Sequence, residues 1–504
     1  MIDAISDRSI TYAELLRRAA SGALALRSYG LKPGDRVGIF LPNSAEFATL
    51  YFTCLIGGFT AVPINSALSL NDREYVLGHS RLSALIVASP SGQVAHNHAE
   101  PSLRNTGKTK TLLFRGFAEG SASEHEIVLG QADHADVLRL LSEVEDDQLF
   151  SIHFTSGTTN LPKGVTHQVA RLLANAEAFG RSFGMDASAR FLHVMPMAYM
   201  AGFLNTLLCP FVVGGSVVIA PQFTAHSALR FWEVVTVFRP NTFWVSPTML
   251  ATLLRVDRGS VGTKFCAREL PRIFSATAPL PLKVRKDFFA KYGVDVVESY
   301  GLSELLLITA NLGPAGSKYG AVGVPIAEAE IEIRSNDGTK MLPGVDGEVF
   351  TRTPHASPGY LNYETGEAEP FLDDWFDTGD VGHLDDDGYL FITGRKKDLI
   401  IRGGFNISPR QVEEVLLRHP AIEDVAVVGI PHDFYGEQII AAVIVKSGYN
   451  LTTVEPDLLS ACRANLAEYA IPDRLVGLVT FPTSTTGKVQ KSKLREQIMA
   501  GTQP

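Results

Sequence analysis

Apolar positions in the first part of the chain form short continuous runs separated by segments of helical length. The pattern predicts strands at Val37–Leu41 and Thr60–Ile64, with a helix at about Ala45–Gly57 between them. The tetrapeptide TYAE that starts at Thr11 is typical of a capping box and predicts a helix reaching about Gly30. Strands that are apolar throughout and alternate with helices indicate a largely parallel sheet with helices on its faces.

The C-terminal part of the chain has a different pattern. Ser408-Pro409 predicts the start of a helix, with Ser408 as N-cap and proline in the first position. Two apolar strands are predicted at Val425–Ile430 and Ile439–Val445, and a further helix near Asp457–Ala467. These elements indicate a small α+β domain, whereas residues 90–125 are polar and are interpreted as a surface connection.

Composition narrows the class of protein. A chain of 504 residues is expected to form two or more domains, and its net charge of −9 gives no general attraction to nucleic acid or to anionic lipid. The four cysteines form no CxxC pair, which argues against a disulfide framework or a zinc site and suits a reducing cytoplasm. Neither a signal peptide nor a membrane anchor is predicted; the apolar stretch Phe203–Ala220 is interpreted as a buried helix, a turn and a strand.

A run of small residues follows the apolar strand that ends at Phe154. It consists of Thr155, Ser156, Gly157, Thr158 and Thr159, and Lys163 adds a positive charge shortly afterwards. Small side chains let backbone N–H groups approach an anion closely, so the run is a candidate polyphosphate clamp. A solvated loop is the alternative interpretation, and the order of glycine and lysine excludes a Walker-type phosphate loop.

The sequence TSGTTNLPKG, from Thr155 to Gly164, resembles the phosphate-binding signature of the adenylate-forming superfamily, which includes acyl-CoA synthetases, peptide-synthetase adenylation domains and luciferases. Asn160 stands where that signature usually has glycine, a mild departure because Asn tolerates positive φ. The resemblance implies a large α/β N-terminal adenylation domain over residues 1–394, a hinge at 395–398, and a mobile C-terminal domain over 399–504.

Further motifs of the same family follow in order. The sequence SYGLSE from Ser299 resembles its YGxTE motif, which implies that Ser303 binds the α-phosphate and that the carboxylate of Glu304 holds magnesium. The sequence FDTGD resembles a motif whose last residue, here Asp380, accepts hydrogen bonds from both ribose hydroxyls. Arg395 is implied as a second ribose contact, and Lys397 as the hinge.

The resemblance also implies an acyl pocket. Tyr199 takes the position of an aromatic gate, although plain core packing is an alternative for it, and Met200 replaces the Asp of amino-acid-adenylating relatives. An α-amino acid is therefore disfavoured as substrate, because a carboxylate partner for its ammonium group is missing at that position. Val245 is expected in the pocket wall and Leu305 in its floor, with a core strand as the alternative for Leu305.

Two motifs of the C-terminal part complete the comparison with the family. Gly403 and Gly404, next to Phe405, would line a narrow tunnel for a pantetheine arm, where side chains would obstruct it. Lys488 in the sequence TGKV would be the catalytic lysine that bridges the substrate carboxylate and the α-phosphate, two anions that repel each other.

The predicted function is an ATP-dependent carboxylic acid–CoA ligase that forms an acyl-adenylate and then a thioester, using ATP, Mg²⁺ and coenzyme A. The acid is expected to be uncharged and mainly apolar, and the protein a cytoplasmic monomer or homodimer. Alternatives are a carrier-protein pantetheine as acceptor, an oxidative or amide-forming adenylating enzyme, and a degenerate binding protein. The resemblance implies Lys488, Glu304 and Thr155 as catalytic residues. The nucleotide site that it implies comprises Thr155, Ser156, Gly157, Thr158, Thr159, Lys163, Ala276, Thr277, Ala278, Ser299, Tyr300, Gly301, Ser303, Asp380, Arg395 and Lys488; the implied acyl site comprises Tyr199, Met200, Ala201, Val245, Ala276, Gly301 and Leu305.

Overall fold

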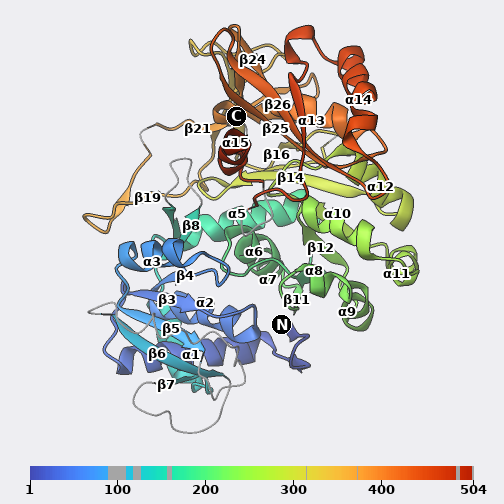
Figure 1. The fold of residues 1–504 in the computed structure, drawn as a ribbon. Helices are drawn as coiled ribbons and strands as arrows, with labels where there is room; N and C mark the ends of the chain where they lie inside the picture. Colours follow the sequence, from blue (N-terminus) through green and yellow to red (C-terminus); the bar gives the residue numbers. More distant parts are fainter. Residues whose placement is uncertain are drawn as a thin grey trace.

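The computed structural model describes residues 1–88, 109–116, 126–155, 162–313, 315–371, 373–483 and 489–501. Four sheets organise these residues, and the first two are large, mostly parallel and covered by helices. Figure 1 shows the C-terminal strands and helices, in orange and red, at the opposite end of the molecule from the N-terminal sheet in blue. No helix among the described residues is long and apolar enough to cross a membrane.

The first sheet has the strand order β20-β19-β9-β8-β4-β3-β5-β6-β7, parallel from β8 to β7 and antiparallel from β8 to β20. Its strands are β3 (Arg36–Phe40), β4 (Thr60–Pro63), β5 (Ala84–Ala88), β6 (Lys110–Gly116), β7 (Glu126–Val128), β8 (Leu149–Thr155), β9 (Lys163–Gln168), β19 (Gly359–Leu361) and β20 (Ala368–Glu369). The helices of this part of the chain are α1 (Tyr12–Ser28), α2 (Ala45–Gly57), α3 (Leu70–His79) and α4 (His134–Ser142).

The second sheet has the order β16-β15-β14-β13-β12-β10-β11-β1-β2, with parallel pairing from β14 to β1. Its strands are β1 (Ile2–Asp3), β2 (Arg8–Ser9), β10 (Arg190–His193), β11 (Ser216–Ile219), β12 (Thr242–Val245), β13 (Arg272–Ser275), β14 (Val296–Leu302), β15 (Leu306–Ala310) and β16 (Val324–Pro325). The helices of this part are α5 (Val169–Ser182), α6 (Met200–Phe203), the π-helix η2 (Leu204–Leu208), α7 (Cys209–Val212), α8 (Ala225–Ala228), α9 (Phe231–Phe238), α10 (Pro247–Val256), α11 (Val261–Glu269) and α12 (Leu282–Tyr292).

Two smaller sheets follow. The antiparallel sheet β17-β18-β21-β22 consists of β17 (Glu330–Arg334), β18 (Gly347–Arg352), β21 (Phe376–Leu384) and β22 (Leu390–Arg395), and the 3₁₀ helix η3 (Lys396–Asp398) comes next. The C-terminal sheet consists of β23 (Ile400–Arg402), β24 (Phe405–Ile407), β25 (Ile422–His432), β26 (Gly436–Val445) and β27 (Arg474–Gly477). Its helices are α13 (Pro409–Leu417), α14 (Leu451–Asn465), η4 (Glu468–Ala470) and α15 (Lys491–Ala500).

Several predicted elements are confirmed. Helix α2 has the predicted bounds, and the side chain of Thr11 caps α1 by accepting a hydrogen bond from the amide of Glu14. The stretch Phe203–Ala220 folds as buried helical turns, a turn and the strand β11. All four cysteines are buried and free, as their scattered positions indicated.

Three local predictions were wrong or incomplete. Residues 90–125 contain the strand β6, because the apolar run in Lys110–Gly116 pairs in parallel with β5 and fills a place in the sheet. Helix α14 starts at Leu451, earlier than predicted, and accommodates Pro456 within its length. Ser408 is the N-cap residue of α13, but its hydroxyl donates to the carbonyl of Thr393 in β22, so it ties two segments together.

Candidate functional site

The carboxylate of Asp380 lies at the centre of one part of the predicted nucleotide site. It is 2% exposed, accepts a hydrogen bond from the Tyr300 hydroxyl at 2.6 Å through Oδ2, and pairs with Nε of Arg395 at 2.8 Å through Oδ1. Asp380 and Arg395 are register partners on β21 and β22, while Tyr300 reaches them from β14 in another sheet. Burial raises the pKa of Tyr300 well above its ordinary value, and the Asp380 charge adds to this, so the phenol stays a donor.

A tight turn between β14 and β15 presents Ser303 and Glu304. The amide of Leu305 donates to the carbonyl of Leu302, and Leu306 has a φ of 61°, a strained conformation for a bulky residue. A Cβ at Gly301 would lie 2.1 Å from the Leu306 carbonyl oxygen, so only glycine fits at that position. The turn leaves Glu304 partly exposed, and its Oε1 accepts a hydrogen bond at 2.8 Å from the Tyr360 hydroxyl.

The hairpin β8–β9 carries the two ends of the predicted phosphate loop. Thr155 and Lys163 are register partners, both partly buried, and bracket residues 156–161, which lie outside the described part of the chain. The Lys163 ammonium lies 4.9 Å from the ring centroid of Tyr360, a cation–π contact. Because Tyr360 also donates to Glu304, it joins the lysine of the phosphate loop to the predicted magnesium ligand.

Tyr199 lies close enough to this cluster to respond to its charges. Burial raises the pKa of the Tyr199 phenol, with the charge of Arg395 opposing the rise and that of Glu304 adding to it. The aromatic ring itself is partly exposed. The charges of a predicted ribose ligand, Arg395, and of the predicted magnesium ligand, Glu304, therefore both act on the predicted gate.

The segment after β13 has an unusual backbone. Thr277 has a φ of 74°, an outlier for a β-branched residue, and its neighbours Ala276 and Ala278 are buried and partly buried. The hydroxyls of Ser275, the last residue of β13, and of Ser299, within the neighbouring strand β14, are buried and have no hydrogen-bond partner among the described residues. Strained backbone next to unsatisfied donors is typical of a ligand site.

The residues predicted for the acyl pocket are divided among three hydrophobic clusters. Met200 and Ala276 belong to the largest cluster, which also contains Leu306 and Leu307. Val245 belongs to a second cluster, against which Tyr199 and Ala201 pack. Leu305 is only 1% exposed and packs in a third cluster, with residues of the sheet β17-β18-β21-β22.

A buried carboxylate lies just before the SYGLSE motif. Glu298 on β14 is 3% exposed, and burial raises its pKa to about 7, while the charges of Arg410 and Arg285 oppose the rise. Its Oε1 is 3.6 Å from the Arg285 guanidinium. Arg410 belongs to α13 and donates to the carbonyl of Ile392 in β22, so a residue of the C-terminal part of the chain acts on the Glu298 carboxyl.

The predicted C-terminal residues lie on the first elements after β22. Lys397 is exposed in η3, and Gly403 and Gly404 form the turn of the hairpin β23–β24 with φ values of 57° and 86°. Positive φ at both positions explains the two glycines, since a two-residue turn of this kind requires it. Phe405 is exposed and stacks on Tyr469 at 4.3 Å, and Lys488 lies outside the described residues.

Sequence reasoning assigned no role to Tyr360, although the structure places it between Lys163 and Glu304. Its position depends on the pairing of β19 with β9, in which Tyr360 is the register partner of Val165. That pairing joins segments far apart in the sequence, and β19 is only three residues long. A lone tyrosine in such a short strand gives no local signal of this role.

Comparison with known proteins identifies the family. The family described as AMP-binding enzyme matches residues 2–361, and the AMP-binding enzyme C-terminal domain matches residues 411–488. The chain therefore belongs to the AMP-binding enzyme family. The predicted family, fold class and enzyme class are confirmed.

Relatives of this chain include CoA ligases for different acids. An oxalate–CoA ligase of Arabidopsis thaliana is 32% identical over 485 residues, which cover 95% of this chain and 91% of the relative. A long-chain-fatty-acid–CoA ligase of Mycobacterium tuberculosis is 30% identical over 508 residues, which cover 99% of this chain and 95% of the relative. The crystal structure of the anthranilate CoA ligase AuaEII with anthranoyl-AMP has a TM-score of 0.83 at 26% identity, over 98% of this chain and 93% of that chain.

Proposed function

We propose that this protein is an ATP-dependent carboxylic acid–CoA ligase that forms an acyl-adenylate and pyrophosphate, and then an acyl-CoA and AMP. The observation that supports the proposal is a pair of contact sets: Asp380 pairs with Arg395 and Tyr300, and Tyr360 contacts both Glu304 and Lys163. Tyr300 and Glu304 flank the same turn, and the pKa of Tyr199 responds to the charges of Arg395 and Glu304. A ribose ligand, a metal ligand, a phosphate ligand and an acyl gate are the parts that the reaction of MgATP with a carboxylate needs.

In this proposal, the carboxylate of Asp380 accepts hydrogen bonds from the ribose hydroxyls, and Arg395 holds that carboxylate in place. Adenine would lie against the backbone of Ala276–Ala278, where Thr277 has a φ of 74°. Thr155 and Lys163 would bind phosphate oxygens together with residues 156–159. Lys488 would stabilise the negative charge that gathers on the α-phosphate during attack by the carboxylate.

Mg²⁺ fits the carboxylate of Glu304, whose Oε1 accepts a hydrogen bond from Tyr360 and whose Oε2 has no hydrogen-bond partner in the described part of the chain. The described residues contain no cluster of three or more His, Cys, Asp or Glu that could hold a metal. A single carboxylate is nevertheless typical for Mg²⁺, which keeps several waters and takes its other ligands from phosphates. When bound, the ion would neutralise charge on the phosphate oxygens.

The acyl group of the proposed acid is uncharged and mainly apolar. Tyr199 and Ala201 pack against the cluster of Val245, and Met200 is 5% exposed in the largest apolar cluster. Burial lowers the pKa of the nearby His193 to about 4, so its imidazole is neutral. An unpaired charge would be costly in such surroundings. The relatives act on acids as different as oxalate and long-chain fatty acids, so family membership alone does not choose the acid.

The division into an adenylation domain (1–394), a hinge at Lys397 and a mobile domain (399–504) is part of the proposal. The second half-reaction would bring Gly403 and Gly404 to the adenylate, with coenzyme A as acceptor and a carrier-protein pantetheine as the alternative. We also propose a monomer or homodimer, and a location in the cytoplasm, which the four buried, unpaired cysteines support.

The experiment that tests this function measures AMP release from ATP with a panel of carboxylic acids, each with and without coenzyme A. The panel contains aliphatic, aromatic and dicarboxylic acids. AMP release that requires coenzyme A and is fastest with one uncharged acid class supports the proposal. Preference for a dicarboxylate would contradict the substrate class, and acid-dependent pyrophosphate release that ignores coenzyme A would assign another acceptor.

A further inference from the structure

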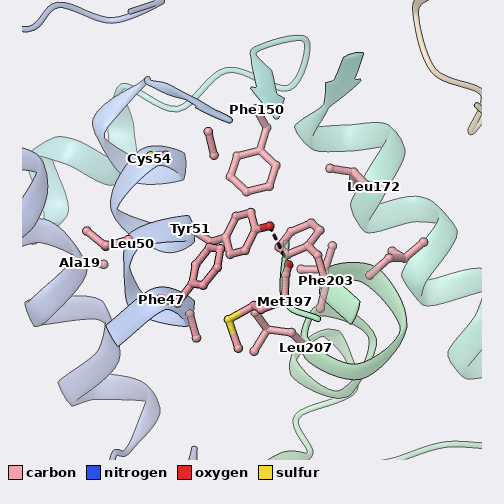
Figure 2. Packing of buried hydrophobic residues seen from close by; sticks show 14 of the residues in the cluster. Ala19, Phe47, Leu50, Tyr51, Cys54, Phe150, Leu172, Met197, Phe203 and Leu207 are labelled. Carbon is pink, nitrogen blue, oxygen red and sulfur yellow. Dashed lines mark hydrogen bonds between the residues drawn. The ribbon is translucent and has the colours of Figure 1, made fainter. Parts of the chain in front are cut away.

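The short segment Met195-Pro196-Met197 leads directly into Tyr199 and α6, and side chains from the first sheet's helix layer hold its backbone. The side-chain amide of Asn43 donates from Nδ2 to the Met195 carbonyl at 2.7 Å and accepts at Oδ1 from the Met197 amide at 2.8 Å. The Tyr51 hydroxyl donates to the Met197 carbonyl at 2.9 Å, as Figure 2 shows. Both backbone polar groups of Met197 are therefore bonded to side chains that lie about 150 positions earlier in sequence, Asn43 with a separation of 154 and Tyr51 with one of 146.

Tyr51 is itself held from the strand that leads into the phosphate loop. Its hydroxyl lies 3.4 Å from Nε2 of His153, and Nδ1 of His153 lies 3.3 Å from the Ser151 hydroxyl. Burial lowers the pKa of His153 to about 3, so the imidazole is neutral. Because Tyr51 gives its proton to Met197, Nε2–H of His153 is the donor to Tyr51, and Ser151 is the donor to Nδ1.

The backbone position of this segment fixes the position of Tyr199. The amide of Tyr199 donates to the Pro196 carbonyl at 3.0 Å, and a Cβ at Gly202 would lie 2.0 Å from that same carbonyl oxygen. A shift of Met195–Met197 therefore moves both the Tyr199 backbone and the first turn of α6. Asn43 is 6% exposed and Tyr51 is fully buried among Phe47, Phe150 and Phe203, so water does not replace their hydrogen bonds.

We propose that Asn43 and Tyr51 are positioning residues that set the acid preference of this enzyme through the placement of Tyr199. The inference rests on the proposed function, in which Tyr199 faces the acid. Neither side chain would touch a substrate: each would act by fixing the segment before the gate. The alternative role, simple cohesion between the two large sheets, predicts a loss of stability without a change of acid preference.

The Tyr51→Phe variant tests the proposal, because it removes one hydroxyl and keeps the packed ring. The matched control is Thr49→Val, on the same helix and also fully buried, whose hydroxyl donates only to the Ala45 carbonyl of its own helix. The measurements are kcat/KM for a small and a large acid of the preferred class, KM for ATP, and Tm. Both variants are also made in a Tyr199→Ala background, so that the coupling between the two tyrosines is measured.

Tyr51→Phe is expected to change the ratio of kcat/KM for the two acids by about fivefold, because the Met197 carbonyl loses its buried partner. KM for ATP should stay within about twofold, Thr49→Val should leave the acid ratio unchanged, and the effect of Tyr51→Phe should vanish in the Tyr199→Ala background. An unchanged ratio, or an equal change in both backgrounds, would overturn the inference. Failure of the proposed function would show earlier, as a wild-type enzyme that releases no AMP with any acid.

Discussion

The Asp380→Asn variant changes one atom in the carboxylate that we assign to the ribose. In the free protein, Asp380 accepts from Tyr300 and pairs with Arg395, and the Arg395 side chain is 43% exposed and can turn toward water when its partner loses charge. Loss of the ion pair therefore costs little stability, and the main loss is of two charge-assisted hydrogen bonds to the ribose hydroxyls. Such bonds contribute roughly 1.5–3 kcal/mol each to binding. With Asn at this position, one of the two bonds is expected to be lost and the other to be weakened.

A loss of about 3 kcal/mol in the affinity for ATP corresponds to a KM for ATP about a hundred times higher, since 1.4 kcal/mol is a factor of ten. KM for the acid should change little. The control is Asp377→Asn on the same strand, whose side chain accepts a turn hydrogen bond from the Gly379 amide at 2.9 Å. The assay is initial-rate AMP release at saturating acid and coenzyme A.

The ribose assignment is tested by pairing the variant with 2′-deoxy-ATP and 3′-deoxy-ATP. The wild-type enzyme should discriminate strongly against both analogues, and Asp380→Asn should discriminate much less, because the partner of the missing hydroxyl is already weakened. Equal discrimination by both enzymes would refute the reasoning, as would a KM increase no larger than that of Asp377→Asn.

The other predictions concern the lysines, the metal ligand and a buried carboxylate. Lys488→Ala should abolish adenylation yet largely spare thioester formation from supplied acyl-adenylate, and equal loss in both assays would contradict its role. Lys397→Pro should do the reverse, so unchanged thioester formation would remove the hinge assignment. Tyr360→Phe frees Oε1 of Glu304 and should raise the Mg²⁺ concentration for half-maximal rate about three- to tenfold; no change would separate Tyr360 from metal binding. The pKa of Glu298 is about 7 in the folded protein, above its ordinary 4.5. Between pH 4.5 and pH 7 the folded chain therefore binds more protons than the unfolded chain. The free energy of unfolding should fall by up to about 3 kcal/mol as pH rises through this range. Glu298→Gln should flatten this fall in urea unfolding at pH 5 and pH 8, and an identical pH dependence would show that another group titrates.

Local sequence signals predicted the elements that local interactions fix. The capping residue Thr11 and the apolar run of α2 gave correct helices. Gly403 and Gly404 were expected only to line a tunnel, and the structure adds that both have positive φ in a hairpin turn. The strand β6 was missed because its short apolar run lies in a polar stretch, and only the place beside β5 in the sheet makes it a strand. The pairing of β19 with β9 likewise depends on segments nearly two hundred positions apart, such as Thr166 and Gly359, which have a separation of 193.

The same distinction holds in the site. The family resemblance named residues such as Asp380 and Glu304 from their motifs, and the structure brings them together with Arg395 and Tyr199. It could not name Tyr360 or Asn43, because neither belongs to a distinctive motif and each acts through a contact across sheets. Met200, Val245 and Leu305 pack in three different clusters, and the pocket that they are expected to share stays a prediction.

The most direct test of the central claim follows the oxygen of the carboxylate. Attack on the α-phosphate makes one carboxylate oxygen the bridge of the acyl-adenylate, and attack of the thiol on the carbonyl then leaves that oxygen on AMP. With an acid labelled with ¹⁸O at both carboxylate oxygens, the adenylate mechanism predicts AMP that carries one ¹⁸O and pyrophosphate that carries none. Both products are measured by mass spectrometry. AMP without the label, or the label in inorganic phosphate with formation of ADP, would contradict the adenylate intermediate.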